Sequence, residues 1–367
     1  MTVTGPGRRG AGDPIPRIVL GPQRLLPTLG RELDALEVTG ELACITAGWQ
    51  ERESEDEELR KACGSRAVRN LRIYERWESV QKADPELAAA HRARQDDLRR
   101  LSELYRLRLD GYKKVLEQVT LTQGPSWLIE PEREAALDAV RRADAHHLAR
   151  IRRIRSEFET QWMPTERPAV ARHREELIGL IGDAAVVLVA GGHVAVLLNR
   201  LQLFGIDSAL AGRPIIAWSA GAMALSDRVV LFHDHPPQGD GRAEVFEEGL
   251  GLFEGLVVLP HARHRLRLSN AMRVSSLARR FAPATCIALD EGDRIGWPDG
   301  VPGRPAHCKR LLLTGQVEAV GGREGPSFPV SPSLEVGVPD DVEGGAAHSA
   351  DRPERPTGAL CESEVQS

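Results

Sequence analysis

A chain of 367 residues, 41% of them hydrophobic, has enough material for one large domain or two ordinary ones with a real core. The formal net charge of −5, with both signs abundant, excludes the basic surface typical of nucleic-acid-binding proteins, and an aromatic content of 4% disfavours stacking on bases or sugars. The cysteines are widely scattered and predict neither a disulfide framework nor a zinc knuckle; they are Cys44, Cys63, Cys286, Cys308 and Cys361.

No targeting or membrane-spanning segment is expected. Residues 1–14 carry positive charge but lack the apolar segment of a secretory signal. No apolar run approaches the roughly 20 residues that a membrane-spanning helix needs. The sequence therefore predicts a cytoplasmic protein with no membrane and no nucleic-acid partner.

In chain order, residues 1–13 are rich in Gly and Arg and are predicted to be disordered, as are residues 325–367, which are rich in Pro, Gly, Ser and acidic residues. Residues 14–324 are predicted to form a single α/β domain. It opens with apolar strands at Ile18–Leu20 and Leu42–Thr46 around a helical stretch, which is a β-α-β pattern. Gly48, after the second strand, lets the chain turn sharply above the sheet.

A long helical insertion is predicted over about residues 84–162. Asp84 can cap a helix whose first position is Pro85, and Gly124-Pro125 later interrupts the helical pattern, so two antiparallel helices are expected. Apolar residues recur at helical spacing in both halves: Leu98, Leu101, Leu104, Tyr105 and Leu109, then Leu137, Val140, Leu148, Ile151 and Ile154. A regulatory or oligomerising role for this insertion stays open, with a homo-oligomer as one outcome.

Short apolar strands alternate with helices over Arg172–Val320. The helices are expected to begin at about Val194, Ala220 and Asn270, between strands at Ala184–Ala190, Ile215–Trp218, Leu256–Leu259 and Cys286–Leu289. This alternation predicts a mostly parallel sheet with helices on both faces, a three-layer α/β sandwich. In such sheets, functional sites form at the carboxyl ends of the strands.

Ser219 is the strongest candidate for chemistry. The chain passes from a β-branched strand directly into small residues around this serine, with Ala217 and Gly221 two positions away on either side, as a nucleophile elbow requires. Such a turn exposes the hydroxyl and places the N–H of Ala220 at a helix N-terminus, where it can donate to an oxyanion. The alternative is a serine that only caps the helix in a tight turn.

Two other strand ends carry candidate residues. Gly191 and Gly192 allow close backbone approach and can supply a second oxyanion donor. His261 directly follows the strand Leu256–Leu259 and is preferred as general base over His264, which lies further from the strand end.

The residue that orients the histidine is open from sequence. Asp290 and Glu291 follow the strand Cys286–Leu289, and Asp234 is the rival, fifteen residues after Ser219. Metal binding is a less favoured alternative, carried by Asp234 and the histidines His233, His235, His261 and His264. Neither a metal nor another cofactor is expected.

The stretch from Ala184 to Trp297 resembles peptidase family S51, the group of dipeptidase E and cyanophycinase, within the class I glutamine amidotransferase-like, flavodoxin-like fold. The matching pieces are DAAVVLVAGGHVAVLLNRL, PIIAWSAGAMALSD, GLGLFEGLVVLPHARHRLRL and CIALDEGDRIGW. The helical insertion has no counterpart in this resemblance; it replaces a β-α-β stretch and could close over the site.

The resemblance implies that Ser219 is the nucleophile, where amidotransferases carry Cys, and that His261 is the general base. Glu291 matches the acid of the cyanophycinase-type pattern and Asp234 that of the dipeptidase E pattern, while Gly192 and Ala220 match the oxyanion donors. The implied reaction is hydrolysis of a peptide bond beside an acidic residue without a metal or cofactor.

Two functions follow as expectations. The first is a serine hydrolase that cleaves a peptide, isopeptide or small amide substrate through an acyl-enzyme at Ser219. The second is a catalytically inactive binding or assembly protein of the same fold. A glutamine amidotransferase is disfavoured because the turn holds Ser in place of Cys.

Overall fold

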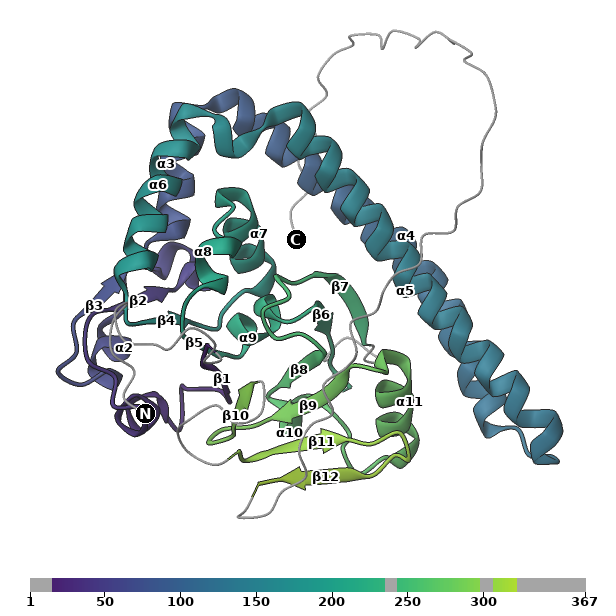
Figure 1. The fold of residues 1–367 in the computed structure, drawn as a ribbon. Helices are drawn as coiled ribbons and strands as arrows, with labels where there is room; N and C mark the ends of the chain where they lie inside the picture. Colours follow the sequence, from purple (N-terminus) through teal and green to yellow (C-terminus); the bar gives the residue numbers. More distant parts are fainter. Residues whose placement is uncertain (1–14, 235–242, 298–305, 322–367) are drawn as a thin grey trace, which may run out of the picture. The chain divides into compact units, whose positions relative to one another are not determined.

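The computed structural model describes residues 15–234, 243–297 and 306–321 (Figure 1). By their contacts, all described residues belong to one compact unit. The ends predicted to be disordered, residues 1–13 and 325–367, lie outside the described residues.

The main sheet has six strands in the order β10-β1-β5-β4-β2-β3. Five of them are parallel, and β10 pairs antiparallel with β1 at one edge. The strands are β1 (Arg17–Leu20), β2 (Leu42–Ile45), β3 (Val68–Asn70), β4 (Val186–Val189), β5 (Ile215–Trp218) and β10 (Arg294–Trp297). The predicted opening strands β1 and β2 share this sheet, but β5 and β4 lie between them.

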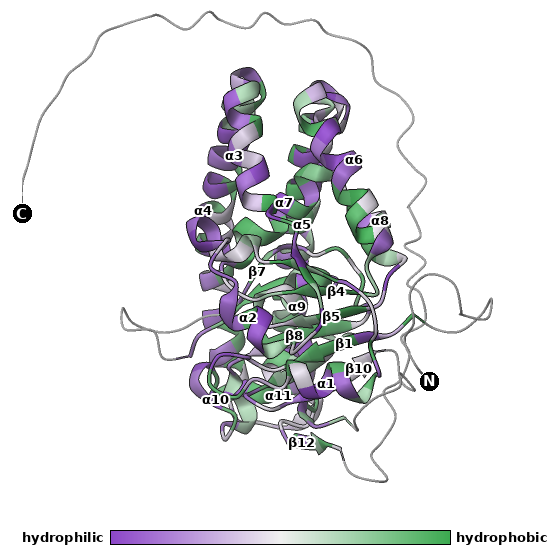
Figure 2. Cartoon of the chain, turned by 90° about the vertical axis from the view of Figure 1, so that its left-hand side faces the viewer, coloured by the Kyte–Doolittle hydropathy of each residue, from purple (hydrophilic) through white to green (hydrophobic). Residues whose placement is uncertain are grey.

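Side chains alternate between two cores across this sheet. Ile18, Leu188 and Ile216 pack on one face with α1 (Leu29–Ala35) and α2 (Glu57–Ala62). The intervening strand residues face a second core, made with α3 (Ile73–Ala83), α6 (Pro168–Asp183), α7 (Val194–Phe204), α8 (Asp207–Ala211) and α9 (Ala220–Leu225). Figure 2 shows the strands β4, β5 and β1 as an apolar layer between the helices. The predicted three-layer α/β sandwich with a mostly parallel sheet is confirmed.

All described strands after α9 except β10 form two smaller sheets, a division that the strand pattern did not reveal. One sheet has the order β12-β11-β9-β8, and the other pairs β6 with β7. A tight turn after β9 sends β10 back onto β1, so β9 pairs with β11 instead of joining the main sheet. The elements are β6 (Arg228–Leu231), β7 (Glu244–Glu248), β8 (Leu256–Pro260), α10 (Ala262–Arg265), α11 (Ala271–Phe281), β9 (Thr285–Leu289), β11 (Cys308–Leu311) and β12 (Val317–Val320).

The predicted helical hairpin is confirmed as α4 (Pro85–Leu121) and α5 (Ser126–Trp162), each 37 residues long. Asp84 caps α4 by accepting a hydrogen bond from the Leu87 amide. At the far end, the guanidinium of Arg133 donates to the carbonyls of Thr120 and Thr122, which no longer have partners within the helix. Leu104 departs from the expected packed stripe, because it is 60% exposed. Short 3-10 helices, η1 (Ala47–Arg52) and η2 (Pro164–Glu166), complete the described helical elements.

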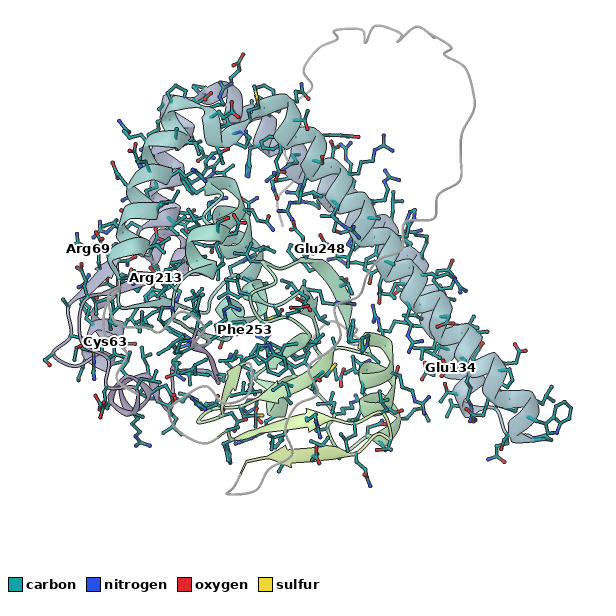
Figure 3. All side chains as sticks on the ribbon, in the orientation of Figure 1. Cys63, Arg69, Glu134, Arg213, Glu248 and Phe253 are labelled. Atoms are coloured by element: carbon teal, nitrogen blue, oxygen red, sulfur yellow. The ribbon has the colours of Figure 1, made fainter. Side chains whose placement is uncertain are left out.

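The hairpin is attached to the rest of the domain by a shared apolar cluster and by polar contacts with β7 and α11. Arg152 pairs with Glu248 at 2.9 Å and Arg279 with Glu134 at 3.4 Å, on elements that Figure 3 places side by side. Between them, Arg280 of α11 makes two hydrogen bonds of 2.7 Å to the carboxylate of Asp144 in α5. Both side chains are almost fully buried, so this pair fixes α11 against the hairpin.

None of the described helices combines the length and the apolar character that crossing a bilayer requires.

Removing the carboxylate of Asp144 is expected to be strongly destabilising, because Arg280 would remain as a buried charge without its partner. Asp144→Ala should lower the free energy of unfolding by about 3–5 kcal/mol. Asp138→Ala on the same helix is the control, since its pair with Arg141 is half exposed and worth about 0–1 kcal/mol. Urea unfolding of both variants measures the difference, and equal losses would contradict this account.

Candidate active site

Ser219 lies at the turn between β5 and α9 with φ 50° and ψ −121°, a conformation that costs a non-glycine residue free energy. Its carbonyl accepts the amide hydrogen bond of Met223 at 3.1 Å, so it also begins the helix. Its side chain makes no hydrogen bond that caps α9, and the residue is half-buried. The serine is therefore held in a strained turn without serving as a side-chain cap.

The turn is tight because the backbone of α9 crosses the end of β4 with almost no space between the two backbones. A Cβ added to Gly221 would lie 2.3 Å from the carbonyl oxygen of Val189, which no side chain can tolerate. A Cβ on Gly191 would lie 2.9 Å from the Cβ of Ser219. Both glycines are therefore needed for β4, β5 and α9 to meet at the serine.

The neighbouring strand end, after β2, brings a further glycine to this edge. Gly48 packs against Gly192, whose φ is +114°, and the carbonyl of Gly48 accepts the amide of His193 at 2.7 Å. This contact fixes the backbone on one side of Ser219, where Gly191 and Gly192 were expected to supply an oxyanion donor. From sequence, Gly48 is expected only to turn the chain above the sheet, because its partner Gly192 lies far away along the chain.

The end of β1 brings the turn after β9, which carries the candidate acids Asp290 and Glu291, to the same edge of the sheet. Leu20 at the end of β1 pairs with Trp218, the residue before Ser219. The next residue, Gly21, donates its amide to the carbonyl of Asp293 at 2.8 Å, and a Cβ there would overlap the carbonyl of Asp290. The turn after β9 thus lies against the strand that neighbours the serine strand.

His261 begins α10 directly after β8, which pairs in parallel with β9 as predicted from the strand ends. Its backbone is left-handed, with φ 57°, and its Nδ1 lies 4.0 Å from Oε1 of Glu291, which is too long for a hydrogen bond. A histidine that directs Nδ1–H to a carboxylate carries its lone pair on Nε2, the form that a general base requires. His264 is exposed on the next turn.

The two other candidate acids have different partners. Asp290 accepts the amide of Arg263 at 2.8 Å and the ammonium of Lys309 at 3.2 Å, and so holds the start of α10. Asp234 accepts two hydrogen bonds from the guanidinium of Arg273 and one from the amide of Arg267. These contacts favour Glu291 over Asp290 and Asp234 as the partner of His261.

The surroundings of His261 lower its pKa below the usual 6.5, because burial disfavours the charged imidazole and the nearby Arg265 repels it. Glu291 opposes this by attracting the imidazolium. The balance leaves the imidazole neutral at pH 7, as a general base must be. The effect of Arg265 could not be read from sequence, because it depends on the short helix α10 that brings its side chain near His261.

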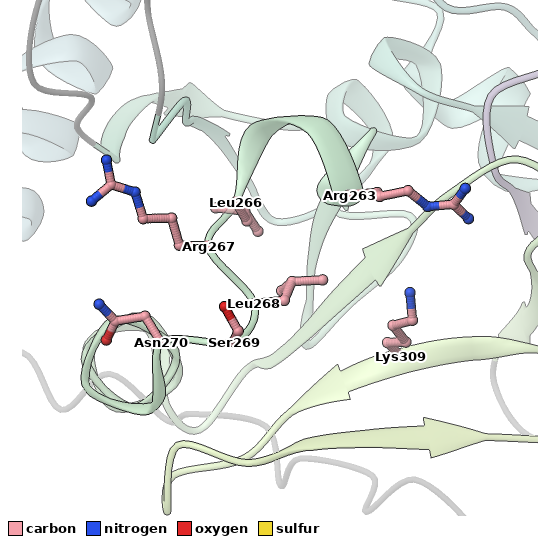
Figure 4. Close-up of a pocket in the computed structure, with 7 residues that line it drawn as sticks. All are labelled: Arg263, Leu266, Arg267, Leu268, Ser269, Asn270 and Lys309. Carbon is pink, nitrogen blue, oxygen red and sulfur yellow. The ribbon is translucent and has the colours of Figure 1, made fainter.

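A basic pocket lies beside this segment, between the loop after α10 and β11 (Figure 4). Its charged lining residues are Arg263, Arg267 and Lys309, with Leu266 and Leu268 between them. Arg263 is 64% exposed and only two residues from His261, so a cationic side chain is available next to the candidate base.

Metal binding receives no geometric support within the described part of the chain, where no three His, Cys, Asp or Glu side chains gather as a metal site would require. His235, one of the histidines considered for a metal, lies outside the described residues. Four cysteines are buried free thiols whose pKa burial raises: Cys44, Cys63, Cys286 and Cys308.

The protein is thus an α/β protein whose Ser219 lies in a strained turn between a parallel strand and a helix, at the carboxyl edge of the main sheet. The model of peptidase family S51 matches residues 138–300, which confirms the resemblance seen in the sequence and indicates a serine hydrolase. The match begins within α5 and ends after β10, so α4 lies outside it. This family carries the class I glutamine amidotransferase-like fold. No curated protein matches the chain.

The close approach of α9 to β4 predicts that Gly221→Ala is destabilising. Overpacking against the Val189 carbonyl should cost at least about 1–3 kcal/mol in the free energy of unfolding. Gly179→Ala is the matched control, because this glycine of α6 has nothing within 4 Å and alanine should stabilise the helix by roughly 0.5–1 kcal/mol. Opposite signs in urea unfolding are expected, and a neutral Gly221→Ala would refute the tight crossing.

The charges around His261 predict opposite shifts of its imidazole pKa in two variants. Arg265→Gln removes a repelling cation and should raise the pKa, whereas Glu291→Gln removes an attracting anion and should lower it. NMR titration of the His261 ring measures both. Shifts of the same sign would show that these groups do not act on His261 through their charges.

Proposed function

We propose that the protein is a serine hydrolase that cleaves a peptide, isopeptide or small amide bond through an acyl-enzyme at Ser219. The observation that carries the proposal is the strained backbone of Ser219, held by the glycine contacts of β4 and α9. A serine that only capped a helix would not need a positive φ, and strain of this kind gathers at functional sites.

In the proposed reaction, His261 takes the proton of the Ser219 hydroxyl while the oxygen attacks the carbonyl carbon of the substrate. The tetrahedral oxyanion is stabilised by backbone N–H groups, for which Ala220 at the start of α9 and the Gly191-Gly192 turn are the candidates. The imidazolium then donates its proton to the leaving amine. Water, activated by the same histidine, hydrolyses the ester and restores the serine.

Glu291 is proposed as the residue that orients His261 and stabilises the imidazolium. Its carboxylate lies 4.0 Å from Nδ1, so a small side-chain rotation would form the hydrogen bond. Catalytic hydrogen bonds are often long before a substrate binds, so this distance is compatible with the role. Asp290 would support it indirectly, through the amide of Arg263 at the start of α10.

The charges near His261 favour a substrate with an acidic group beside the bond that is cleaved. Arg263 is 64% exposed and two residues from the histidine, Arg265 lies on the same short helix, and Lys309 lies on β11, which pairs with β9. A carboxylate on the substrate would be attracted by these groups. The same preference is implied by the resemblance to peptidase family S51.

The proposal is tested by covalent labelling with a fluorophosphonate, which reacts with activated serines. The full-length protein should be labelled, whereas Ser219→Ala should not react, and His261→Ala should react roughly 10²–10⁴ times more slowly. Ser269→Ala is the control, because this exposed serine lies in the basic pocket and should leave labelling unchanged.

Mass spectrometry of the labelled peptide identifies the serine that has reacted. If the native protein is not labelled under conditions in which a known serine hydrolase reacts, the enzymatic proposal is refuted. A binding protein of this fold is then favoured. Labelling at another serine would refute the role of Ser219 but would leave the proposal of a serine hydrolase standing.

A further inference from the structure

A second cavity lies away from Ser219, between the helical hairpin and α11. Its volume is about 610 Å³, within the range of about 300–1,000 Å³ typical of small-molecule sites. Figure 1 shows α11 alongside the hairpin, and the lining residues come from α4, α5, α11 and two connecting segments. The cavity therefore exists because the hairpin packs beside α11.

Three cations are close together at one end of this cavity: Lys113 of α4, and Arg273 and Arg280 of α11. Arg280 is neutralised by Asp144 through two hydrogen bonds of 2.7 Å. Arg273 uses Nε and Nη2 on one oxygen of Asp234, at 2.9 and 2.7 Å. The two carboxylates are thus each committed to one arginine.

Lys113 is left without a comparable partner. It makes no hydrogen bond or ion pair with any residue in the part of the chain that the structure describes. Its surroundings lower its pKa to about 7, first because burial disfavours the ammonium and then because Arg273 and Arg280 repel it. Asp234 and Asp144 oppose this shift. When Lys113 is protonated, these three cations outnumber the carboxylates of Asp144 and Asp234 by one.

We propose that this cavity is a binding site for a small organic anion whose carboxylate or phosphate group is held by Lys113 and Arg273. An oxyanion placed there would supply the missing negative charge and accept hydrogen bonds from both groups. Nη1 of Arg273 makes no hydrogen bond with the described residues, so it can donate to the ligand. The apolar side chains of Leu116, Leu137 and Val140 line the remaining space and suit a carbon skeleton.

Binding should depend on pH through Lys113, which is charged below about 7 and neutral above it. An anion that needs the ammonium binds more tightly as the pH falls through this value. The other charged groups that line the cavity or act on Lys113 come from α4, α5, α11 and the connecting segments: Asp110, Lys114, Glu117, Glu130, Arg133, Glu134, Asp144, Asp234, Arg267, Arg273, Arg279 and Arg280.

Calorimetric titration of the full-length protein with sulfate and with succinate tests the proposal. Sulfate stands for a tetrahedral phosphate group and does not itself titrate near neutral pH, and succinate stands for a carboxylate ligand. Saturable binding is expected for at least one anion, and the stronger of the two shows which oxyanion geometry the site prefers. Lys113→Gln should weaken it about tenfold, the loss of one charge-assisted contact.

Two further variants distinguish anion binding in this cavity from a general effect of protein charge on the affinity. Lys82→Gln makes the same charge change at an exposed position of α3 and should leave the affinity unaltered. Lys113→Arg keeps the cation but cannot lose its proton, so it should bind and lose the pH dependence around 7.

No saturable binding of either anion to the native protein would overturn the proposal, as would equal affinities of the native protein and Lys113→Gln. The readout is binding alone, so its outcome does not depend on whether Ser219 reacts.

Discussion

The arrangement of the site depends on backbone packed directly on backbone at the carboxyl edge of the main sheet. Gly221 lies against the carbonyl of Val189, Gly192 against Gly48, and Gly21 against Asp290, each too close for a side chain. These contacts join the ends of β5, β4, β2 and β1 and the turn after β9 into one rigid edge. Ser219 can keep its strained conformation because its surroundings on this edge cannot relax.

The three candidate acids differ in the charged and polar groups that they contact. Asp290 is occupied by the start of α10 and Asp234 by Arg273, which leaves Glu291 beside His261. The same committed pair of Asp234 and Arg273 forms one wall of the cavity under the hairpin. The ion pair that occupies Asp234 is therefore also part of the cationic cavity.

Much of the fold could be predicted from local sequence. The strand Ile215–Trp218, the break at Gly124-Pro125 and the helix caps at Asp84 and Asn270 are signalled by residues that act on their immediate neighbours. The short half-exposed strands were missed. β3 and β7 lack a continuous apolar run, and their side chains are only partly buried.

The parts of the site that could not be predicted depend on residues far apart in the chain. From sequence, Asp234 and Glu291 stay rival candidates, because each matches the acid of one pattern of the family. Arg273 on α11 gives Asp234 a partner of its own, which only the folded structure shows. Lys113 carries no signal in the sequence, since nothing in its own helix shows that α11 brings two arginines near it. Pairwise charge environments of this kind arise only when the helices pack.

The position of β1 has a consequence for the order in which the chain can fold. This strand is near the N-terminus, yet it lies between β5 and β10, so Arg17 pairs with both Ile215 and Trp297. During synthesis, β1 has no neighbour until β5 is made, and its second neighbour, β10, follows only near the end of the domain, whereas the hairpin of α4 and α5 needs only local contacts. The serine edge is therefore completed late, and a nascent chain that ends before β10 lacks the strand whose pairing with β1 holds the turn of Glu291 at this edge.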